Sequence, residues 1–483
     1  MTQGGPAKVI PLQPVDDSGE LVSLYQAQKK IHPRAVSGWF AGWRWALVWF
    51  TQALFYGLPW LEWHGRQALL FDLGARRFYI FGLVLYPQDF IYLTGLLMIS
   101  AYALFLFTAV AGRLWCGYAC PQTVYTEIFM WVEQKFEGDR LARIRLDAAP
   151  WSFDKLWRKG GKQIVWIALA LWTGFTFVGY FTPIKELAAE VATLGLGPWE
   201  WFWILFYGFA TYGFAGHMRE QVCKYMCPYA RFQSAMFDRD TLIISYDAER
   251  GEPRGSRSKK ADPKTLGLGA CIDCTLCVQV CPTGIDIRKG LQYECIGCAA
   301  CIDVCDGVMD KMGYERGLIR YDTENGLERH LSTRQRWLRV FRPRVLIYGA
   351  VLLLLVAGLL TSLLTRAPFR VDVLRDRAAL ARLVDDGYIE NVYRLQIMNT
   401  TEATQHYRVA ASGLDGLALA QPVRVEVEPA QQRWVSVALR LPPQQAARLG
   451  SGVHEIHFSV ERQAGAGESA YQRQEKSTFV VPR

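Results

Sequence analysis

Several common features are missing from this chain, and their absence narrows its function. Residues 1–36 contain no apolar run that ends at a small-residue cleavage site, so we expect no cleavable signal peptide. No segment resembles a nucleic-acid-binding module, and the arginines cluster beside apolar stretches, so we expect no nucleic-acid partner despite a net charge of +9. Residues 366–483 contain no cysteine, although the whole chain has 12. Any cysteine chemistry therefore belongs to the part of the chain before residue 366.

Eight of the cysteines lie between Cys271 and Cys305 and repeat one spacing, Cys-x2-Cys-x2-Cys-x3-Cys. This spacing is typical of ferredoxins, in which three thiolates hold one [4Fe–4S] cluster and the fourth reaches the other cluster. Zinc sites favour two separated pairs of ligands, and eight crowded cysteines would make unusually dense disulfides. We therefore expect two [4Fe–4S] clusters as cofactors. The predicted ligands are Cys271, Cys274, Cys277 and Cys305 for one cluster, and Cys295, Cys298, Cys301 and Cys281 for the other.

The four remaining cysteines form a second repeated motif, Cys-x3-Cys-Pro, which twice follows an apolar stretch. Residues four apart share one face of a helix, so each pair can present two sulfurs side by side. Four thiolates that converge at a membrane surface suit a soft metal such as Cu(I), or a further iron–sulfur cluster. Inert buried thiols are the simpler alternative, but two copies at equivalent positions favour a functional site. The residues predicted to act in catalysis and to bind copper are Cys116, Cys120, Cys223 and Cys227.

Other side chains near the second copy have simpler interpretations. Met218 and Met226 could add thioether ligands, but ordinary packing in an aromatic-rich bundle is favoured. A lone interfacial histidine such as His217 is more often structural than a ligand. Arg219 and Glu220 are expected to pair with each other or with lipid headgroups.

Apolar residues make up 51% of the chain and aromatic residues 13%, which suggests membrane spans edged by aromatic belts. Five stretches approach the roughly 20 apolar residues that cross a bilayer. The first is the weakest because Arg44 interrupts it, and the stretch 78–87 is too short to cross, so we expect it to be re-entrant or interfacial. The predicted spans are 39–61, 89–112, 163–182, 199–217 and 345–365.

The distribution of basic residues predicts the orientation. The segment 113–163 carries nine Lys and Arg, whereas the connections on the opposite side carry only Arg66, Arg76 and Arg77 in one and Lys185 in the other. Because basic loops stay in the cytoplasm, the N-terminus and the cluster domain are expected there, and the C-terminal region outside. The cysteines agree, since cluster thiolates need a reducing compartment.

Residues after the last predicted span change character. Short runs of alternating apolar and polar residues, separated by Gly, Pro and Asn, predict an immunoglobulin-like sandwich. Its role, partner binding or structural support, stays open. The expected fold class is a polytopic α-helical membrane protein of about five spans, with an inserted two-cluster ferredoxin-like α+β domain and a C-terminal all-β immunoglobulin-like sandwich. The predicted domains are a cytoplasmic tail (1–36), a four-span membrane domain (37–230), the ferredoxin-like domain (231–335), the fifth span (336–366) and the sandwich (367–483).

The motifs resemble those of a known family. The strings Cys271-IDCTLCVQVCPTGIDIR, Tyr293-ECIGCAACIDVCDGVMDKMGY and Arg113-LWCGYACPQTVYTEIFMW are similar to those of the CcoG/FixG/RdxA family of cytochrome c oxidase accessory proteins. The resemblance runs from about residue 35 to the C-terminus. Related NapH and NosR membrane ferredoxins share the Cys-x3-Cys-Pro pair but are not expected to carry the sandwich. The sandwich therefore favours the first family.

The resemblance implies an enzyme, a cupric reductase of the bacterial inner membrane. It would reduce Cu(II) to Cu(I) for assembly of the cbb-type cytochrome c oxidase, with electrons from a cytoplasmic donor. The expected partners are that donor, a copper donor, the oxidase or its assembly factors, and membrane lipid; a homodimer is left open. The resemblance also implies that the sandwich is periplasmic.

Two other functions stay open at this point. One is an electron-transfer subunit linked to quinol oxidation, in the manner of NapH, with the Cys-x3-Cys-Pro pairs facing a quinone pocket or a further cluster. The other is a non-enzymatic scaffold for oxidase assembly, whose clusters are structural.

Overall fold

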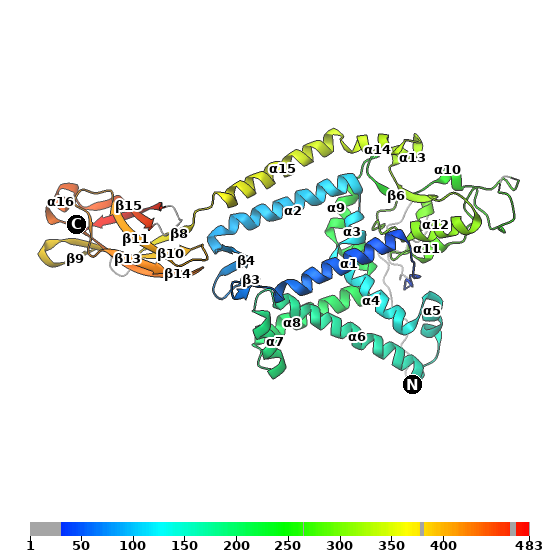
Figure 1. Cartoon of the computed structure of the whole chain (residues 1–483), viewed down its shortest axis with the longest axis horizontal. Helices are drawn as coiled ribbons and strands as arrows, with labels where there is room; N and C mark the ends of the chain where they lie inside the picture. The colour runs from blue at the N-terminus through cyan, green and yellow to red at the C-terminus, as the bar shows by residue number, and fades with distance from the viewer. Residues whose placement is uncertain (1–29, 264, 377–380, 464–469, 483) are drawn as a thin grey trace, which may run out of the picture. The chain divides into compact units, whose positions relative to one another are not determined.

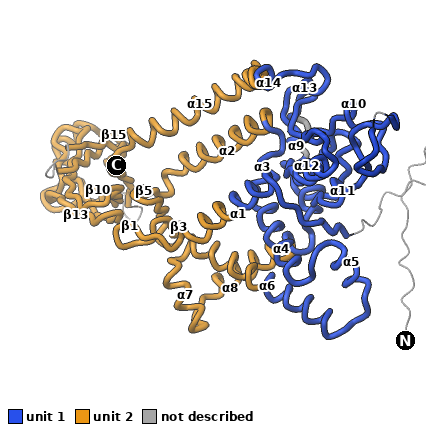
Figure 2. Tube along the Cα trace, turned by 45° about the vertical axis from the view of Figure 1, so that its right-hand side comes forward, with its two compact units in different colours: residues 1–47, 111–166, 214–336 blue, residues 48–110, 167–213, 337–483 orange. Residues whose placement is uncertain are grey.

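The chain folds into two compact units that interleave along the sequence (Figure 2). Helices α1 (Trp39–Gly57) and α6 (Phe153–Val178) begin in unit 1 and end in unit 2. The computed structural model describes residues 30–263, 265–376, 381–463 and 470–482, so most of the predicted N-terminal tail lies outside the described residues. Unit 1 comprises residues 1–47, 111–166 and 214–336; unit 2 comprises residues 48–110, 167–213 and 337–483. All 12 cysteines belong to unit 1.

The part of unit 1 before residue 237 is mainly helical, and two of its helices start at the prolines of the Cys-x3-Cys-Pro motifs. Pro121 and Pro228 each occupy the first position of a helix, where the missing N–H costs nothing and the fixed φ favours helix formation. The last cysteine of each motif is therefore the residue directly before a helix. The helical elements of this part of unit 1 are α3 (Leu114–Tyr118), α4 (Pro121–Glu137), α5 (Arg140–Ala148), the π-helical turns η3 (Tyr212–Met218) and η4 (Val222–Met226), and α9 (Pro228–Met236).

The second half of unit 1 is a small α+β domain around the eight clustered cysteines. Strand β6 (Ile243–Tyr246; Figure 1) pairs antiparallel with β7 (Ile319–Asp322). Apolar side chains of both strands share a core with five of the cysteines. In the sequence, β6 precedes the eight cysteines and β7 follows them. The helices of this domain are α10 (Ala248–Gly251), α11 (Leu276–Gln279), η5 (Ile287–Lys289), α12 (Ala300–Met312), α13 (Glu324–Glu328) and α14 (Thr333–Val340), the last of which continues into unit 2.

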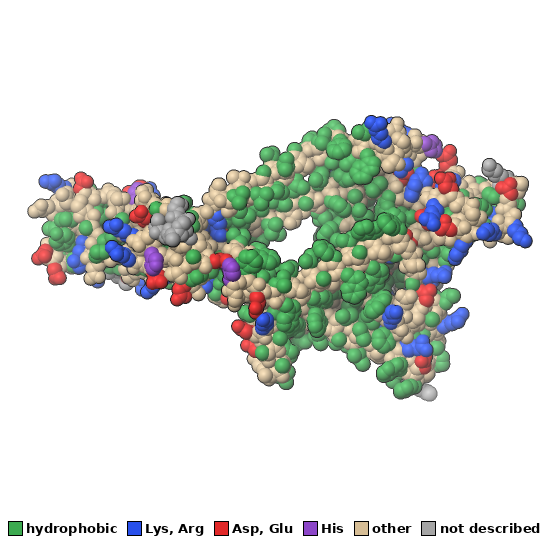
Figure 3. Space-filling view, in the orientation of Figure 1, with side chains coloured by type: hydrophobic (Ala, Val, Ile, Leu, Met, Phe, Trp, Pro, Cys, Tyr) green, Lys and Arg blue, Asp and Glu red, His purple; other side chains and the backbone are tan. Residues whose placement is uncertain are grey.

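Unit 2 contains long apolar helices whose side chains stay exposed, as a bilayer would allow (Figure 3). Within it, α2 (Phe90–Ala111) and α15 (Pro343–Leu364) contact each other, since a Cβ on Gly95 would lie 3.1 Å from Leu359. Three helical segments of the described chain are long and apolar enough to cross a membrane: Pro87–Ala111, Phe153–Val178 and Pro343–Leu364. The chain thus has candidate membrane helices, and the count of five spans stays a prediction.

The first and fourth predicted spans are not among these three helices, and each has a feature that sets it apart. Helix α1 is 19 residues long but carries a buried Arg44. Helix α8 (Pro198–Thr211) has only 14 residues before the chain changes to the π-helical turn η3. Helix α7 (Ile184–Thr193) lies in the connection between α6 and α8.

The stretch 78–87 forms strands, a structure that its apolar composition alone did not indicate. Strands β3 (Leu69–Asp72), β4 (Arg77–Ile80) and β5 (Leu83–Leu85) make an antiparallel sheet, preceded by the pair β1 (Glu62–Trp63) and β2 (Arg66–Gln67). Short helical turns η1 (Leu58–Trp60) and η2 (Pro87–Asp89) flank these strands.

The C-terminal region is a two-sheet sandwich, as its alternating pattern predicts. One sheet has the strand order β12-β14-β10-β8 with β9 paired to β10, and the other has the order β13-β11-β15-β16. Apolar side chains from both sheets form one core. The strands are β8 (Phe369–Arg375), β9 (Arg382–Leu383), β10 (Ile389–Asn399), β11 (Gln405–Ser412), β12 (Ala418–Leu419), β13 (Val423–Val427), β14 (Gln432–Leu441), β15 (Gly452–Arg462) and β16 (Tyr471–Val481), with η6 (Asp385–Gly387) and α16 (Pro443–Leu449) between them.

Candidate functional site

The eight cysteines of the α+β domain surround two neighbouring cavities. The first cavity, of about 370 Å³, is walled by apolar side chains of β7 and α12, among them Ile319 and Met309. The second, of about 330 Å³, is walled by Ile244, Ile285 and Ile287. The cysteines of the first cavity, which we call set 1, are Cys271, Cys274, Cys277 and Cys305. Those of the second, which we call set 2, are Cys281, Cys295, Cys298 and Cys301, with Cys277 also on its wall.

The grouping is the one that the spacing predicts, with the fourth cysteine of each run in the other set. Cys305, on α12, lies with the three cysteines of the first run, and Cys281 lies with those of the second. Because Cys277 lines both cavities, the two sets are direct neighbours. The structure thus brings together all eight predicted cluster ligands in two groups of four.

The donors of both sets suit iron–sulfur clusters. Among the described residues, each cavity is lined by the four cysteines of its set and by no histidine or carboxylate. Four cysteine thiolates are the ligands of a [4Fe–4S] cluster, so the donors of both sets suit two such clusters. Burial raises the pKa of both Cys295 and Cys305 to about 12. A positively charged iron centre would stabilise them as thiolates.

The cysteines of the two Cys-x3-Cys-Pro motifs also come together, and we call these four the membrane-motif set. The pKa of Cys116 is raised to about 12, mainly by burial and in smaller part by Cys120, Cys223 and Cys227, which are close enough to interact with it electrostatically. Arg113 acts in the opposite direction. A set of four sulfurs beside a cation is therefore assembled from segments about a hundred residues apart in the sequence.

The two cysteines of each motif do not share a helix face, which corrects the expectation from their spacing. Cys116 lies on α3 and Cys223 on η4, but both turns end before the second cysteine. Cys120 and Cys227 have extended backbone conformations, with ψ of 128° and 110°. The reason is the following proline, which disfavours the helical conformation in the residue before it.

The membrane-motif set and set 2 meet backbone to backbone. Gly117 lies so close to the chain at Cys298 that a Cβ on it would be 2.8 Å from the Cys298 nitrogen. On the other side of this contact, Gly297 has a φ of +71°, and its Cβ would lie 3.0 Å from the Arg113 carbonyl oxygen. Cys116 and Cys223 pack against the apolar group that contains Cys298. Only glycines allow the two motifs to approach this closely.

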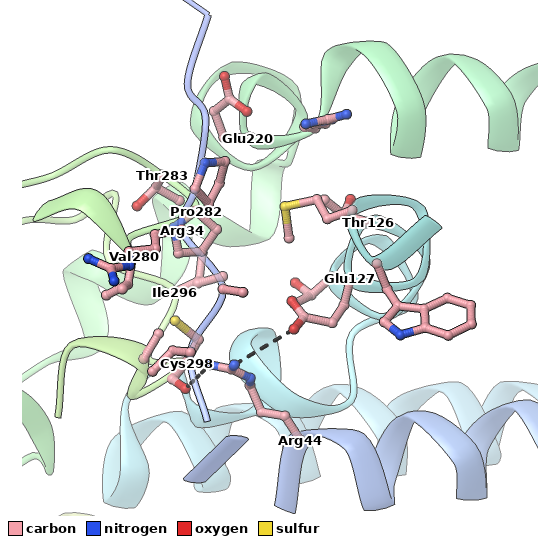
Figure 4. A pocket seen from close by; sticks show the side chains of 18 of the residues that line it. Arg34, Arg44, Thr126, Glu127, Glu220, Val280, Pro282, Thr283, Ile296 and Cys298 are labelled. Carbon is pink, nitrogen blue, oxygen red and sulfur yellow. Dashed lines mark hydrogen bonds and ion pairs between the residues drawn. The ribbon is translucent and has the colours of Figure 1, made fainter. Parts of the chain in front are cut away.

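Two buried arginines hold this contact in place. Arg44 of α1 donates to the Cys298 carbonyl oxygen at 2.8 Å, and its guanidinium lies 3.7 Å from Glu127 (Figure 4). Arg113 donates to the Gln233 amide oxygen at 2.9 Å and to the carbonyl oxygen of Cys295 at 3.3 Å. Sequence reasoning missed both roles, although an arginine inside an apolar stretch was a signal for Arg44.

A pocket of about 980 Å³, a volume that includes its open mouth, is lined by Cys298 of set 2 (Figure 4) and by Cys223 of the membrane-motif set. Its walls include the aromatic pair Trp45 and Trp131, whose ring centroids are 6.2 Å apart. Carboxylates and arginines supply the polar part of the lining. These charged residues are Glu127, Glu220, Arg34, Arg44, Arg143 and Arg219.

A buried ion network supports the second motif. Glu133 of α4 is 1% exposed and accepts from Arg143 and Arg219, each at 2.9 Å, and Lys162 lies 3.5 Å away. Burial alone would raise the pKa of Glu133, but the three cations outweigh it and lower the pKa to about 2. Arg219 therefore pairs with Glu133 and not with Glu220, which corrects the expectation from their adjacency.

Three family models match the chain. A model described as "4Fe-4S dicluster domain" covers residues 218–324, which contain set 1, set 2 and the second Cys-x3-Cys-Pro motif. A model described as "4Fe-4S binding domain" covers residues 93–138, whose only cysteines are Cys116 and Cys120. A third, described as "IG-like fold at C-terminal of FixG, putative oxidoreductase", covers residues 359–482. The 4Fe–4S character of the domain and the immunoglobulin-like fold are thus both supported.

Similar proteins cover most of the chain. "Nitrogen fixation protein FixG" of Rhizobium meliloti is 38% identical over 469 residues, which are 89% of this chain and 90% of that protein. "Protein RdxA" of Cereibacter sphaeroides is 41% identical over 402 residues, 82% of this chain and 84% of that protein. A crystal structure of a FixG-related protein from Vibrio parahaemolyticus matches 24% of this chain and 97% of its own, at 25% identity and a TM-score of 0.20.

Proposed function

The chain belongs to the FixG/RdxA family, and from that premise we propose that it is a membrane iron–sulfur protein that reduces Cu(II) to Cu(I) for assembly of a cbb-type cytochrome c oxidase. The reaction transfers one electron to each ion, Cu(II) + e⁻ → Cu(I), and needs no proton and no covalent bond. A cytoplasmic donor supplies the electron. No general acid or base is therefore required.

The observation that carries this proposal is a series of neighbouring cavities in unit 1, in which each cavity shares a lining cysteine with the next. Cys274 is exposed, Cys277 lines both cluster cavities, and Cys298 lines both the second cavity and the large pocket. Cys223 of the membrane-motif set lines the same pocket. Bound at sets 1 and 2, [4Fe–4S] clusters would supply one-electron carriers, and this order would lead electrons from the protein surface to the pocket.

The pocket offers ligands for both oxidation states of copper. Cu(II) prefers nitrogen and oxygen ligands, whereas thiolates select Cu(I). Glu127 and Glu220 line the pocket (Figure 4), as does Cys223. We therefore place the incoming Cu(II) at the carboxylates and the reduced ion at the thiolates of the membrane-motif set.

Residues of the chain hold set 2 and the membrane-motif set close to each other. Arg44 and Arg113 fix the backbone around Cys298 and Cys295. Gly117 allows the first membrane motif to touch the loop of set 2. We further propose that the cluster domain faces the cytoplasm of a bacterial inner membrane. The sandwich would then face the periplasm, where the oxidase or its assembly factors could bind it.

The test is anaerobic purification of the wild type and the Cys116→Ser/Cys223→Ser variant, with counts of iron, sulfide and copper. We expect the variant to keep about eight iron atoms, those of two cubanes, and to lose its bound copper. Reduction of Cu(II) by dithionite-reduced protein, followed with a Cu(I)-specific chelator, should fall in the variant. Wild-type protein that binds iron but reduces no Cu(II) would refute the proposal.

A second candidate for the membrane-motif set is a third [4Fe–4S] cluster. The specific observation in its favour is the 4Fe–4S family model over residues 93–138, which contain no cysteines besides Cys116 and Cys120. The same iron count separates the two possibilities. A third cubane would bring the wild type to about twelve iron atoms, and the double variant would lose about four of them.

A further inference from the structure

The edge of set 1 that faces solvent identifies where electrons can enter. Of the 12 cysteines, Cys274 alone is exposed, while its neighbours Cys271 and Cys277 are buried. In set 2, Cys298 is only 9% exposed. Because electron transfer between proteins requires close approach of the two centres, a soluble donor reaches this chain most directly at Cys274.

The segment of the sequence that contains Cys274 is basic. The segment 252–290 carries seven Lys and Arg against four Asp and Glu. Three of the acids are already paired within the domain, because Arg288 binds Asp273 and Asp286, and Glu252 lies 3.7 Å from Arg254. The exposed basic residues of this surface, which we call the basic rim, are Arg254, Lys259, Lys260 and Lys289.

Backbone hydrogen bonds connect the loop that carries part of the basic rim to the chain at Cys271 of set 1. Lys259 and Lys260 lie in a loop whose base is closed by a bond from the Gly269 N–H to the Pro253 carbonyl oxygen at 2.8 Å. The Gly255 N–H bonds to the Cys271 carbonyl oxygen at 3.3 Å, so this loop rests on the chain that holds set 1. Lys289 directly follows Arg288, which lines the set 1 cavity. Figure 3 shows Lys and Arg side chains at the outer end of the α+β domain.

Two exposed apolar side chains complete the surface. Leu266 is 53% exposed in the same loop, and Leu291 is 55% exposed two residues after Lys289. A few apolar contacts with charged residues around them are typical of weak interfaces between proteins. Among the described residues, Lys259, Lys260 and Lys289 form no ion pair, so these charges are available to a partner.

We propose that the basic rim docks an acidic one-electron carrier protein, of the flavodoxin or ferredoxin class, as the electron donor. This inference rests on the proposed function and names the class of its donor. The carrier loses one electron and the centre held by set 1 gains it, with no transfer of protons or atoms. Complementary charge mainly accelerates association, by factors of about 10 to 1,000 that fall with ionic strength.

The experiment uses the purified holoprotein and the Lys259→Glu/Lys260→Glu/Lys289→Glu variant. Reduction of its iron–sulfur absorbance by a reduced acidic flavodoxin is followed by stopped flow at low and high salt. At low salt we expect the variant to react at least about tenfold more slowly, with the difference vanishing at about 0.5 M salt, where screening acts over a few ångströms. Reduced methyl viologen, a cation, should react faster with the variant than with the wild type.

A matched control carries the same charge change on the C-terminal sandwich. The Arg394→Glu/Arg408→Glu/Arg424→Glu variant replaces three exposed residues outside unit 1 and should react with flavodoxin at the wild-type rate. Equal iron content in all three proteins shows that the clusters are intact. Binding of oxidised flavodoxin, measured by calorimetry at low salt, should weaken only in the first variant.

The outcomes separate this inference from the proposed function. The docking site is refuted if the basic-rim variant keeps wild-type kinetics and binding at low salt. It is refuted equally if the sandwich variant shows the same decrease in reduction rate and in flavodoxin affinity as the basic-rim variant. It is also refuted if the rim variant changes only binding to vesicles of anionic lipid. Absence of Cu(II) reduction by dithionite-treated wild type would overturn the proposed function, while the flavodoxin binding would still report on docking.

Discussion

Replacing Glu133 by glutamine should destabilise unit 1 strongly. The change removes the only negative charge within salt-bridge distance of Arg143 and Arg219, among the residues that the structure describes, and leaves both guanidinium groups buried. Losing one partner of a buried ion pair costs about 3–5 kcal/mol. The pKa of Glu133 gives a similar value, because a decrease from 4.5 to about 2 corresponds to about 3 kcal/mol of interaction with the charged form.

The measurement is chemical unfolding of detergent-solubilised protein, followed by tryptophan fluorescence. The Asp154→Asn variant is the matched control, because Asp154 pairs with Arg158 at 2.9 Å on the exposed side of α6. A surface pair of this kind contributes about 0.3–0.5 kcal/mol. Adding Arg219→Met to Glu133→Gln should recover part of the loss, since it removes one of the unpaired buried cations.

The pH dependence gives an independent check. Folding lowers the pKa of Glu133, so its contribution is fully present above about pH 4.5 and is lost as the pH falls towards 2. The glutamine variant should lack this part of the acid-induced loss of stability. If Glu133→Gln costs no more than Asp154→Asn, the network does not stabilise the fold, and the argument from burial and pairing is wrong.

Three further changes test the contacts between the cysteine sets. Gly117→Ala places a methyl group 2.8 Å from the set 2 backbone, so the iron content of the protein should fall. Gly160→Ala is the control, because nothing lies within 4 Å of the added methyl group, and it should leave the iron content unchanged. Equal iron content in the two variants would contradict the close approach of Gly117 to set 2. Arg44→Met removes a buried cation beside set 2, so redox titration followed by paramagnetic resonance should give a lower potential for one cluster, while Arg44→Lys should shift it less. Cys305→Ser should abolish the paramagnetic signal of the set 1 cluster and remove about four iron atoms; loss of the set 2 signal instead would refute the grouping.

The sequence predicted the cysteine sets because ligand spacing is a local property. A loop with cysteines three residues apart wraps one centre wherever it lies in a fold, so the grouping of the eight cysteines needed no tertiary information. The sandwich was predictable for a similar reason, since alternation along each strand reflects which face is buried. The helical pairing of each Cys-x3-Cys motif was wrong because the proline after the second cysteine outweighs the periodicity.

The contacts that join the sets could not be predicted in this way. Gly117 touches the chain at Cys298, about 180 residues later in the sequence, and neither residue type indicates the other. Arg44 looked like a weakness in a membrane span, yet it binds the Cys298 carbonyl oxygen. Glu133 lies on a helix whose pattern does not distinguish a buried ion network from a solvated face. Long-range contacts of this kind depend on tertiary packing, which the local pattern does not encode.

The exposure of the cysteines favours one direction of electron flow. A centre near solvent can meet a protein donor, whereas a buried centre exchanges electrons only with its neighbours. Cys274 is exposed, while Cys298 lies buried between the second cavity and the pocket. A small ion can enter a pocket that a protein donor cannot, so the donor and the copper ion would use opposite ends of the series. Under the proposed function, this separation would keep the donor from reacting directly with copper.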